Sequence, residues 1–293
     1  MARDAPTIVG SYWTLAGDAQ PPPGDGPEWS PLDLRDRVET AARVGFGGMG
    51  LWHADVERVT ERYTLEEVRA LLDANGIEHV ELEFVEYPHL DPGHPGHDAM
   101  DDRLDRLLEL AATLDAHHVK LGNIEGSAVP LPALRELLAD LAERAEAVDT
   151  AVGLEVITAD PNLRAVEDAL SVVDGIPNAG LILDTWHVVK MGLPYEAVAS
   201  IPADALVGVE LNDGYLETDM TIDEETTGYR RLPGEGEYDV AGFVDAVRET
   251  GYDGPWGVEV LSKELRRLPM EEAYRRAYDR TVEVLGRASA RAR

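Results

Sequence analysis

The sequence predicts a (β/α)8 TIM barrel that forms a single domain over residues 1–293. Eight short segments typical of strands alternate with eight helical patterns along the chain. The length of 293 residues accommodates the roughly 250 residues of such a barrel, and no change in composition marks a second domain. An open doubly wound sheet is the alternative, but no GxGxxG turn follows the first strand.

The predicted strands are short, and most are rich in Val, Ile and Leu and bounded by Gly or Pro. This composition is expected for strands of a parallel sheet that are buried on both faces. In chain order they are Thr7–Leu15, Gly48–Trp52, His79–Glu86, His118–Gly122, Val152–Ile157, Gly180–Thr185, Leu206–Leu211 and Trp256–Leu261.

Helical patterns fill the intervals between these strands. Three of them end before a glycine in the position of a C-terminal cap, namely Gly45, Gly76 and Gly251. In chain order the predicted helices are Leu32–Val44, Thr64–Asn75, Ala99–Asp115, Leu131–Val148, Pro161–Val173, Pro194–Ser200, Val240–Thr250 and Met270–Ala288.

The charge of the chain restricts its partners. It has 57 acidic and 26 basic residues and a net charge of −31, and its only lysines are Lys120, Lys190 and Lys263. Such a polyanion repels phosphate backbones and anionic lipids, so we expect it to bind neither nucleic acid nor membrane. The dispersed acidity fits either a high-salt environment or an ordinary solvated surface.

Cysteine is absent, which excludes disulfides, thiolate catalysis and cysteine-ligated zinc. No apolar run approaches the ~18 residues of a membrane span, and the segment MARDAPTIVG has no apolar core of a signal peptide. We therefore expect a cytoplasmic protein.

Four carboxylates interrupt apolar segments near the ends of the last four predicted strands. They are Glu155 in VGLEVI, Asp184 in GLILDTW, Glu210 in VGVELND and Glu259 in WGVEVL. A buried, ionised carboxylate costs several kcal/mol unless it is paired or metal-bound. Because the carboxyl ends of barrel strands meet at one face, these oxygens predict a site for one divalent ion, Mn²⁺ or Mg²⁺.

The surrounding motifs resemble the xylose isomerase-like family of sugar phosphate isomerases and epimerases, which includes ketose 3-epimerases, hydroxypyruvate isomerases and inosose dehydratases. The resemblance covers nearly the whole chain and is most specific in LEV, DTWH, RRLPGEGEYD and GYDGPWGVEV. It implies a metal ion held by Glu155, Asp184, Glu210 and Glu259 and a substrate contacted by His187 and Arg230.

Strand 7 departs from the family pattern. The family's H-x-x-D reads Glu210-Leu211-Asn212-Asp213 here, so a carboxylate replaces an imidazole. If Glu210 binds the metal, four carboxylates around one dication leave about two surplus negative charges, which protonation or Lys120 would relieve. If it does not, His187 or water takes its place.

These residues suggest an isomerase or epimerase acting on a sugar or polyol ketone through a metal-stabilised enediolate. Glu155 and Glu259, on opposite faces of the substrate, would take and return the proton. A dehydratase of the inosose type would use the same enediolate, and a non-catalytic binding subunit is the other alternative, because Glu210 replaces a histidine. The resemblance is compatible with a homodimer or homotetramer.

Three further residues are candidates for substrate binding. Lys120 would act as a Schiff-base or proton-transfer group, although an ion pair with Glu155 or Glu83 is the favoured interpretation. Glu83 would support the site or pair with that lysine. His53, after the second strand, would contact substrate or water.

Two histidine groups lie outside this pattern. We expect His89, His94 and His97 to lie in a loop without converging on a metal ion. The pair His117-His118 begins the fourth strand, at the end of the barrel opposite the chemistry, and is interpreted as structural.

Overall fold

The computed structural model describes residues 6–22, 24 and 26–291. In this part of the chain, eight parallel strands form a closed barrel in sequence order, and the first strand pairs with the last. The predicted fold is therefore confirmed. The strands are β1 Ile8–Gly10, β2 Gly48–Trp52, β3 His79–Glu86, β4 His118–Gly122, β5 Ala151–Glu155, β6 Ala179–Asp184, β7 Leu206–Leu211 and β8 Trp256–Val258.

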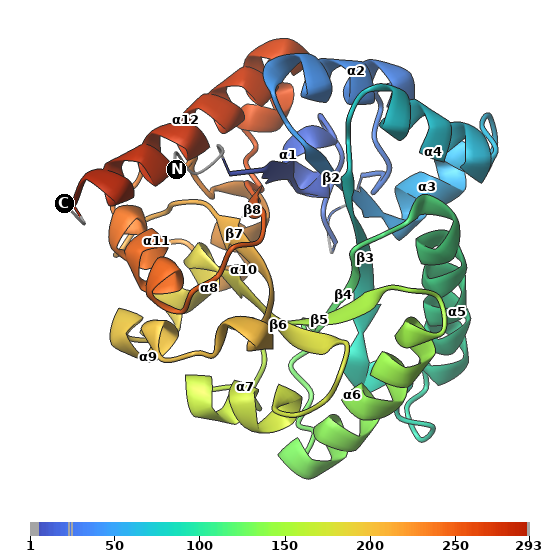
Figure 1. Cartoon of the computed structure of the whole chain (residues 1–293), viewed down its shortest axis with the longest axis vertical. Helices are drawn as coiled ribbons and strands as arrows, with labels where there is room; N and C mark the ends of the chain where they lie inside the picture. Colours follow the sequence, from blue (N-terminus) through green and yellow to red (C-terminus); the bar gives the residue numbers. More distant parts are fainter. Residues whose placement is uncertain (1–5, 23, 25, 292–293) are drawn as a thin grey trace.

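Helices surround the barrel as an outer ring (Figure 1). The longer ones are α2 Leu34–Val44, α4 Leu65–Ala74, α5 His97–Leu114, α6 Leu131–Glu146, α7 Val166–Val173, α11 Val240–Glu249 and α12 Met270–Arg291. Further helices of at most eight residues lie in the loops: α1 Tyr12–Leu15, α3 His53–Thr60, η1 Tyr87–Leu90, α8 Thr185–Lys190, α9 Tyr195–Ala199, η2 Ala203–Ala205, α10 Ile222–Gly228 and η3 Leu265–Arg267. None of the helices in the described residues combines the length and apolarity needed to cross a bilayer.

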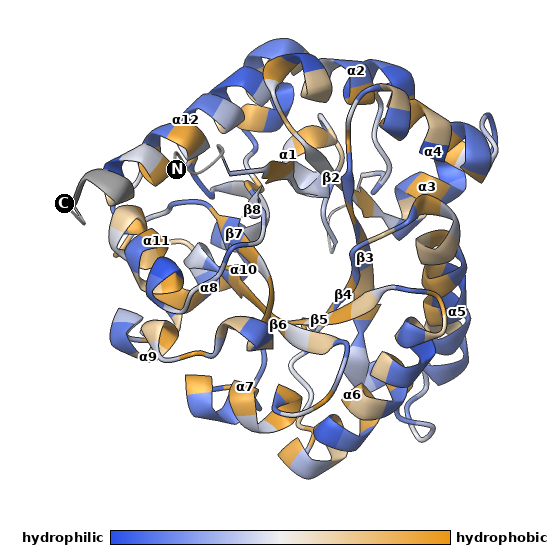
Figure 2. Ribbon diagram, viewed as in Figure 1, coloured by the Kyte–Doolittle hydropathy of each residue, from blue (hydrophilic) through white to orange (hydrophobic). Residues whose placement is uncertain are grey.

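The hydrophobic core lies between the barrel and its helices. Figure 2 shows hydrophobic residues along the strands and hydrophilic residues on the outer faces of the helices. Val38 and Ala41 of α2 and Leu107 and Leu110 of α5 are fully buried, as the inward faces of amphipathic helices should be. Apolar burial thus covers the outside of the sheet and leaves the carboxyl ends of the strands to polar side chains.

Two predicted strands are shorter than expected. The segment Thr7–Leu15 contains a strand only at Ile8–Gly10, and Tyr12–Leu15 forms helix α1. The hydroxyl of Thr14 in α1 donates to the carbonyl of Val258 at 2.8 Å and accepts from the amide of Val260 at 2.8 Å. These bonds lie where β8 ends, at Val258. A short apolar run does not distinguish a strand from a buried helical turn.

Helices α3, α8 and α10 were not predicted. Helix α3 begins at His53, directly after β2, and α8 begins at Thr185, directly after β6. The predicted helix Pro161–Val173 begins only at Val166. Each of these differences lies at the carboxyl end of the barrel, where tertiary contacts and helix caps outweigh local periodicity.

A buried ion pair fastens α2 to the first turn of α3. The guanidinium of Arg37 donates to the Asp55 carboxylate at 2.5 Å, both side chains are almost fully buried, and Asp55 also accepts from the amide of Ser30 at 2.8 Å. The two opposite charges therefore compensate each other inside the protein.

Arg37→Met is expected to lower the free energy of unfolding by about 3–5 kcal/mol, because Asp55 would be left as a buried charge without its cation. Arg35→Met on the same helix is the control. Arg35 is 55% exposed, so its loss should change stability by at most about 0.5 kcal/mol. Urea unfolding of both variants measures the difference, and equal effects would contradict the assignment.

Candidate metal centre and active site

Four acidic side chains converge at the carboxyl ends of β5 to β8. Glu155 ends β5, Asp184 ends β6, Glu210 lies in β7 and Glu259 follows β8. Each is at most 5% exposed, and each brings one oxygen within 4.8 Å of the chosen oxygens of the other three. Neighbouring parallel strands supply them, because the barrel places successive strand ends side by side.

Lys120 lies among the same carboxylates. Its ammonium on β4 is 2.7 Å from Glu210 Oε1 and 3.3 Å from Glu259 Oε1. It is also 3.8 Å from Glu83 Oε2 and 3.9 Å from Glu155 Oε2. Burial alone would lower the pKa of Lys120, but these carboxylates raise it well above the ordinary value. The shortest contact of Lys120 is with Glu210 of β7.

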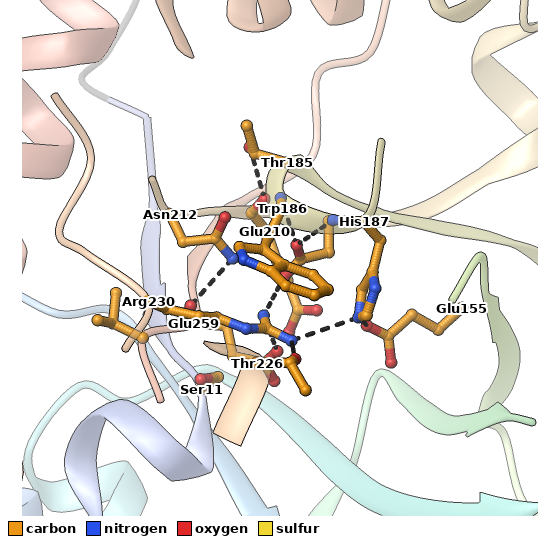
Figure 3. A network of polar contacts seen from close by, with 12 residues as sticks. Ser11, Glu155, Thr185, Trp186, His187, Glu210, Asn212, Thr226, Arg230 and Glu259 are labelled. Atoms are coloured by element: carbon orange, nitrogen blue, oxygen red, sulfur yellow. Dashed lines mark hydrogen bonds and ion pairs between the residues drawn. The ribbon is translucent and has the colours of Figure 1, made fainter. Parts of the chain in front are cut away.

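Arg230 is the second cation of the cluster (Figure 3). Its Nη1 donates to Asp184 Oδ2 at 2.8 Å and to Glu259 Oε2 at 2.9 Å. Its Nη2 donates to the Thr226 hydroxyl at 2.8 Å, and the guanidinium lies 5.2 Å from the centre of the Trp186 ring. Arg230 therefore holds two acidic side chains in place, and its contacts leave little of its guanidinium for a substrate.

Asp184 both caps a helix and faces the cluster. Its Oδ1 accepts from the amides of Trp186 at 2.7 Å and His187 at 3.2 Å at the start of α8. Its Oδ2 accepts from the guanidinium of Arg230 and from the side-chain amide of Asn212, each at 2.8 Å. The capping bonds fix the orientation of the carboxylate.

His187 lies beside Glu155. The backbone amide of Thr158 donates to His187 Nδ1 at 3.2 Å, and Nη2 of Arg230 lies 3.3 Å from His187 Nε2. That nitrogen is 3.6 Å from Glu155 Oε1. Burial and the charge of Arg230 hold the pKa of His187 well below its ordinary value, so the ring is neutral and both of its nitrogens have polar neighbours.

Burial raises the pKa of three carboxyl groups here. The pKa of Glu155 rises to about 8 and that of Glu83 to about 7, and the pKa of Glu210 rises well above its ordinary value. In each case burial is the leading cause, and neighbouring carboxylates add to it while Lys120 opposes it. The negative charge of the cluster is thus not fully compensated by the protein.

A divalent ion fits these residues. Two cations, Lys120 and Arg230, face five carboxyl groups, those of Glu83 and of the four converging residues. If all five were ionised, three negative charges would be left without a partner. One dication would reduce this surplus to one. Glu210 Oε2 is buried without a hydrogen-bond partner. A donor set of carboxylate oxygens suits a hard cation such as Mg²⁺ or Mn²⁺.

Two predicted substrate contacts lie to the side of this cluster. His53 Nδ1 is 3.3 Å from the backbone oxygen of Glu83, and burial lowers the pKa of His53 to about 4. The carboxyl group of Glu83 reaches Lys120, but its Oε1 is buried and unpartnered. Their roles in binding a substrate stay predictions.

The loop histidines form a separate arrangement. The rings of His89 and His94 stack at 4.1 Å, and their Nε2 atoms lie 2.7 Å and 3.4 Å from Glu125 Oε2. His97 begins α5 and its Nδ1 is buried without a partner. His89 and His94 thus converge on a carboxylate, which the sequence did not predict.

Sequence reasoning missed several residues that hold the site. Thr158 orients His187, Thr226 orients Arg230, and Asn212 joins Asp184 to the backbone oxygen of Glu259 at 3.0 Å. The spacing of Thr226 and Arg230 by four residues beside a short helix is the one local signal. The other contacts cross between strands.

Residues 38–284 match the family model described as xylose isomerase-like TIM barrel. This match covers most of the chain. The chain belongs to the xylose isomerase-like TIM barrel family. The resemblance inferred from the strand-end motifs is confirmed.

Named relatives of this family include a dehydratase and an isomerase. The chain is 27% identical over 241 residues to the 3-dehydroshikimate dehydratase of Pseudomonas aeruginosa. The aligned region covers 80% of this chain and 37% of that protein. It is 26% identical over 155 residues to the inosose isomerase of Bacillus subtilis, covering 52% of this chain and 55% of that protein. The matches thus span about a third and about half of these curated relatives.

The fold is also shared with a solved structure of the IolI protein with a bound zinc atom. The TM-score is 0.79 at 19% sequence identity, and the match covers 96% of this chain and 99% of that chain. At this identity the likeness shows the fold.

Proposed function

We propose that this protein is a divalent-metal-dependent isomerase or epimerase of a small sugar or polyol ketone. The observation that carries the proposal is the convergence of Glu155, Asp184, Glu210 and Glu259 on one buried point at the barrel mouth. The isomerase among the relatives and the zinc bound by the IolI protein support it.

The four converging carboxylates would hold the ion. When bound, such an ion supplies Lewis-acid polarisation of substrate oxygens and stabilises the negative charge that develops on them. Mg²⁺ and Mn²⁺ suit the oxygen donors better than zinc does.

Glu155 and Glu259 are the two candidates for proton transfer, one to take the proton and the other to return it. Burial raises the pKa of Glu155 to about 8 in the absence of metal, and binding of the ion would require its carboxylate form. Glu259 faces a cation on each oxygen, Lys120 at 3.3 Å and Arg230 at 2.9 Å. As a carboxylate it can accept the proton from the carbon next to the carbonyl.

His187 and an aromatic group complete the substrate site. His187, with Nε2 3.6 Å from Glu155 Oε1, would contact a substrate hydroxyl or carbonyl oxygen. Three aromatic rings pack together at the ends of β1 and β2. The ring centre of Trp13 lies 4.9 Å from that of Tyr12 and 4.9 Å from that of Trp52. They line the side of the barrel opposite β5 and β6 and would exclude water from the face of a sugar ring.

A dehydratase is the second candidate, because the match to the 3-dehydroshikimate dehydratase extends over 80% of this chain. Both reactions begin with removal of a proton next to a carbonyl. In the dehydratase the resulting enediolate or enolate expels a β-hydroxyl as water, whereas in the isomerase it is reprotonated.

The metal dependence is tested on untagged protein treated with a chelator and dialysed. We expect one equivalent of Mn²⁺ to bind and turnover to depend on it. Ketoses, inososes and 3-dehydroshikimate, each assayed in D₂O by NMR and mass spectrometry, distinguish the reactions. An isomerase retains all heavy atoms of the substrate and exchanges one carbon-bound hydrogen for deuterium, whereas a dehydratase loses water. Absence of stoichiometric metal would contradict the proposal and favour a binding subunit.

A further inference from the structure

Three histidines meet at the amino-terminal end of the barrel, opposite the carboxylate cluster. His79 is the first residue of β3, His118 is the first residue of β4, and His117 directly precedes it. Each offers one ring nitrogen that lies within 4.8 Å of those of the other two. From the sequence, His117 and His118 were expected to be structural, and no contact with His79 was predicted.

The sheet holds these rings in place. Glu81 of β3 is paired with His118 of β4, and the amide of His117 donates to the carbonyl of Val80 at 2.8 Å. The His117 and His118 Nδ1 atoms are 3.0 Å apart, and the ring centres of His79 and His117 are 4.4 Å apart. Two nitrogens bound to the same tetrahedral zinc ion are about 3.3 Å apart. The Nδ1 atoms of His117 and His118 are near this separation, and His79 offers a nitrogen within 4.8 Å of one on each of the other two rings.

Glu81 adds an independent indication. Its side chain is buried, and its Oε1 lies 3.2 Å from His79 Nε2. A proton on Nε2 shared with this carboxylate leaves Nδ1 of His79 with a lone pair. Metal-bound histidines commonly direct their other nitrogen to a carboxylate in this way, which fixes the tautomer and makes the ring a better ligand.

Access and burial also suit a bound ion. His118 is 1% exposed, and its Nε2 is buried without a hydrogen-bond partner. His117 lies at the surface, so an ion can reach the rings from solvent and keep a water molecule as a further ligand.

The second histidine group provides a contrast. His94 Nδ1 accepts from the amide of Gly96 at 3.0 Å, which leaves its proton on Nε2, directed at Glu125. Both ring nitrogens of His94 thus already have partners, and the group of His89, His94 and Glu125 is complete as a hydrogen-bonded cluster.

We propose that His79, His117 and His118 bind one transition-metal ion of the zinc, cobalt or nickel class. Imidazole nitrogens favour these ions over Mg²⁺ and Mn²⁺, so the site would be chemically distinct from the carboxylate cluster. The bound ion would link the starts of β3 and β4. This proposal does not depend on the proposed function.

Equilibrium dialysis of untagged protein against Co²⁺, with metal analysis and visible absorption spectra, tests the proposal. His117→Ala should bind one equivalent less than the wild-type protein and lose the absorption of nitrogen-ligated cobalt. His94→Ala is the control and should bind as many equivalents as the wild type. The test uses the difference in cobalt stoichiometry between variant and wild type. Cobalt bound by the carboxylate cluster is present in both proteins and therefore does not affect this difference.

Glu81→Gln supplies a second variant, expected to weaken cobalt binding at this site about 10–100-fold. Because His117 lies at the surface, its replacement should leave the thermal unfolding midpoint of the metal-free protein unchanged. An unaltered cobalt stoichiometry in His117→Ala, or an equal loss in His94→Ala, would overturn the proposal.

Discussion

Glu155→Gln and Glu259→Gln are each expected to lower kcat at least 100-fold, within the ~10²–10⁴-fold that general acid–base catalysis contributes. Glutamine keeps the size of the side chain but can neither hold nor accept the transferred proton. The loss should appear in kcat more than in KM, because the proton moves only after the substrate is bound. Steady-state kinetics on the substrate found in the panel measures it.

Glu86→Gln is the matched control. Glu86 is buried at the end of β3 and accepts the amides of Ile124 and Glu125 at 2.7 Å and 3.2 Å, which a glutamine oxygen can also do. Its activity should stay near that of the wild type. Retention of more than a few per cent of activity in both Glu155→Gln and Glu259→Gln would remove these residues from the proton transfer.

Lys120→Met is expected to make the stability of the protein strongly dependent on metal. The ammonium contacts Glu210 and Glu259. Its loss leaves Arg230, which contacts Asp184 and Glu259, as the remaining cation beside these carboxylates in the described residues. In the metal-free protein this should lower the free energy of unfolding by about 3–5 kcal/mol, as for other broken buried ion pairs.

The same substitution should tighten divalent metal binding at least about tenfold, which corresponds to roughly 1.4 kcal/mol, because the ammonium no longer repels the ion. Calorimetric Mn²⁺ titration and thermal unfolding with and without Mn²⁺ measure both effects. Lys263→Met, which removes a cation stacked on Tyr229 at 4.7 Å, should change neither. Unchanged Mn²⁺ affinity in Lys120→Met would show that Lys120 and the ion do not compete.

Lys120 offers a physical account of Glu210 in β7, where the family resemblance implied a histidine. The ammonium of Lys120 lies 2.7 Å from Glu210. When Glu210 is ionised, this pair has no net charge and therefore matches the charge of a neutral histidine. The favoured interpretation of Lys120 as an ion-pair residue agrees with its contacts, although its shortest partner is Glu210 and not Glu155 or Glu83.

The sequence alone was sufficient for the barrel and for the identity of its acidic residues. Alternation of buried strands with amphipathic helices is a local property that every βα unit repeats, and strand ends in a barrel meet at one face by topology. A carboxylate inside an apolar run stands out without coordinates, because burial of an unpaired charge is costly. Glu155, Asp184 and Glu259 were therefore recognisable from their neighbours.

Only the tertiary structure decided how the charges are shared. Contacts of Arg230 with Asp184 and Glu259, of Thr158 with His187, and of His79 with His117 join residues far apart in sequence. Neither periodicity nor spacing encodes such distances, because they depend on which strands the closed barrel makes neighbours and on the rotamers that packing allows. The same dependence on tertiary contacts explains why Tyr12–Leu15 turns into a helix where a local apolar pattern favoured a strand.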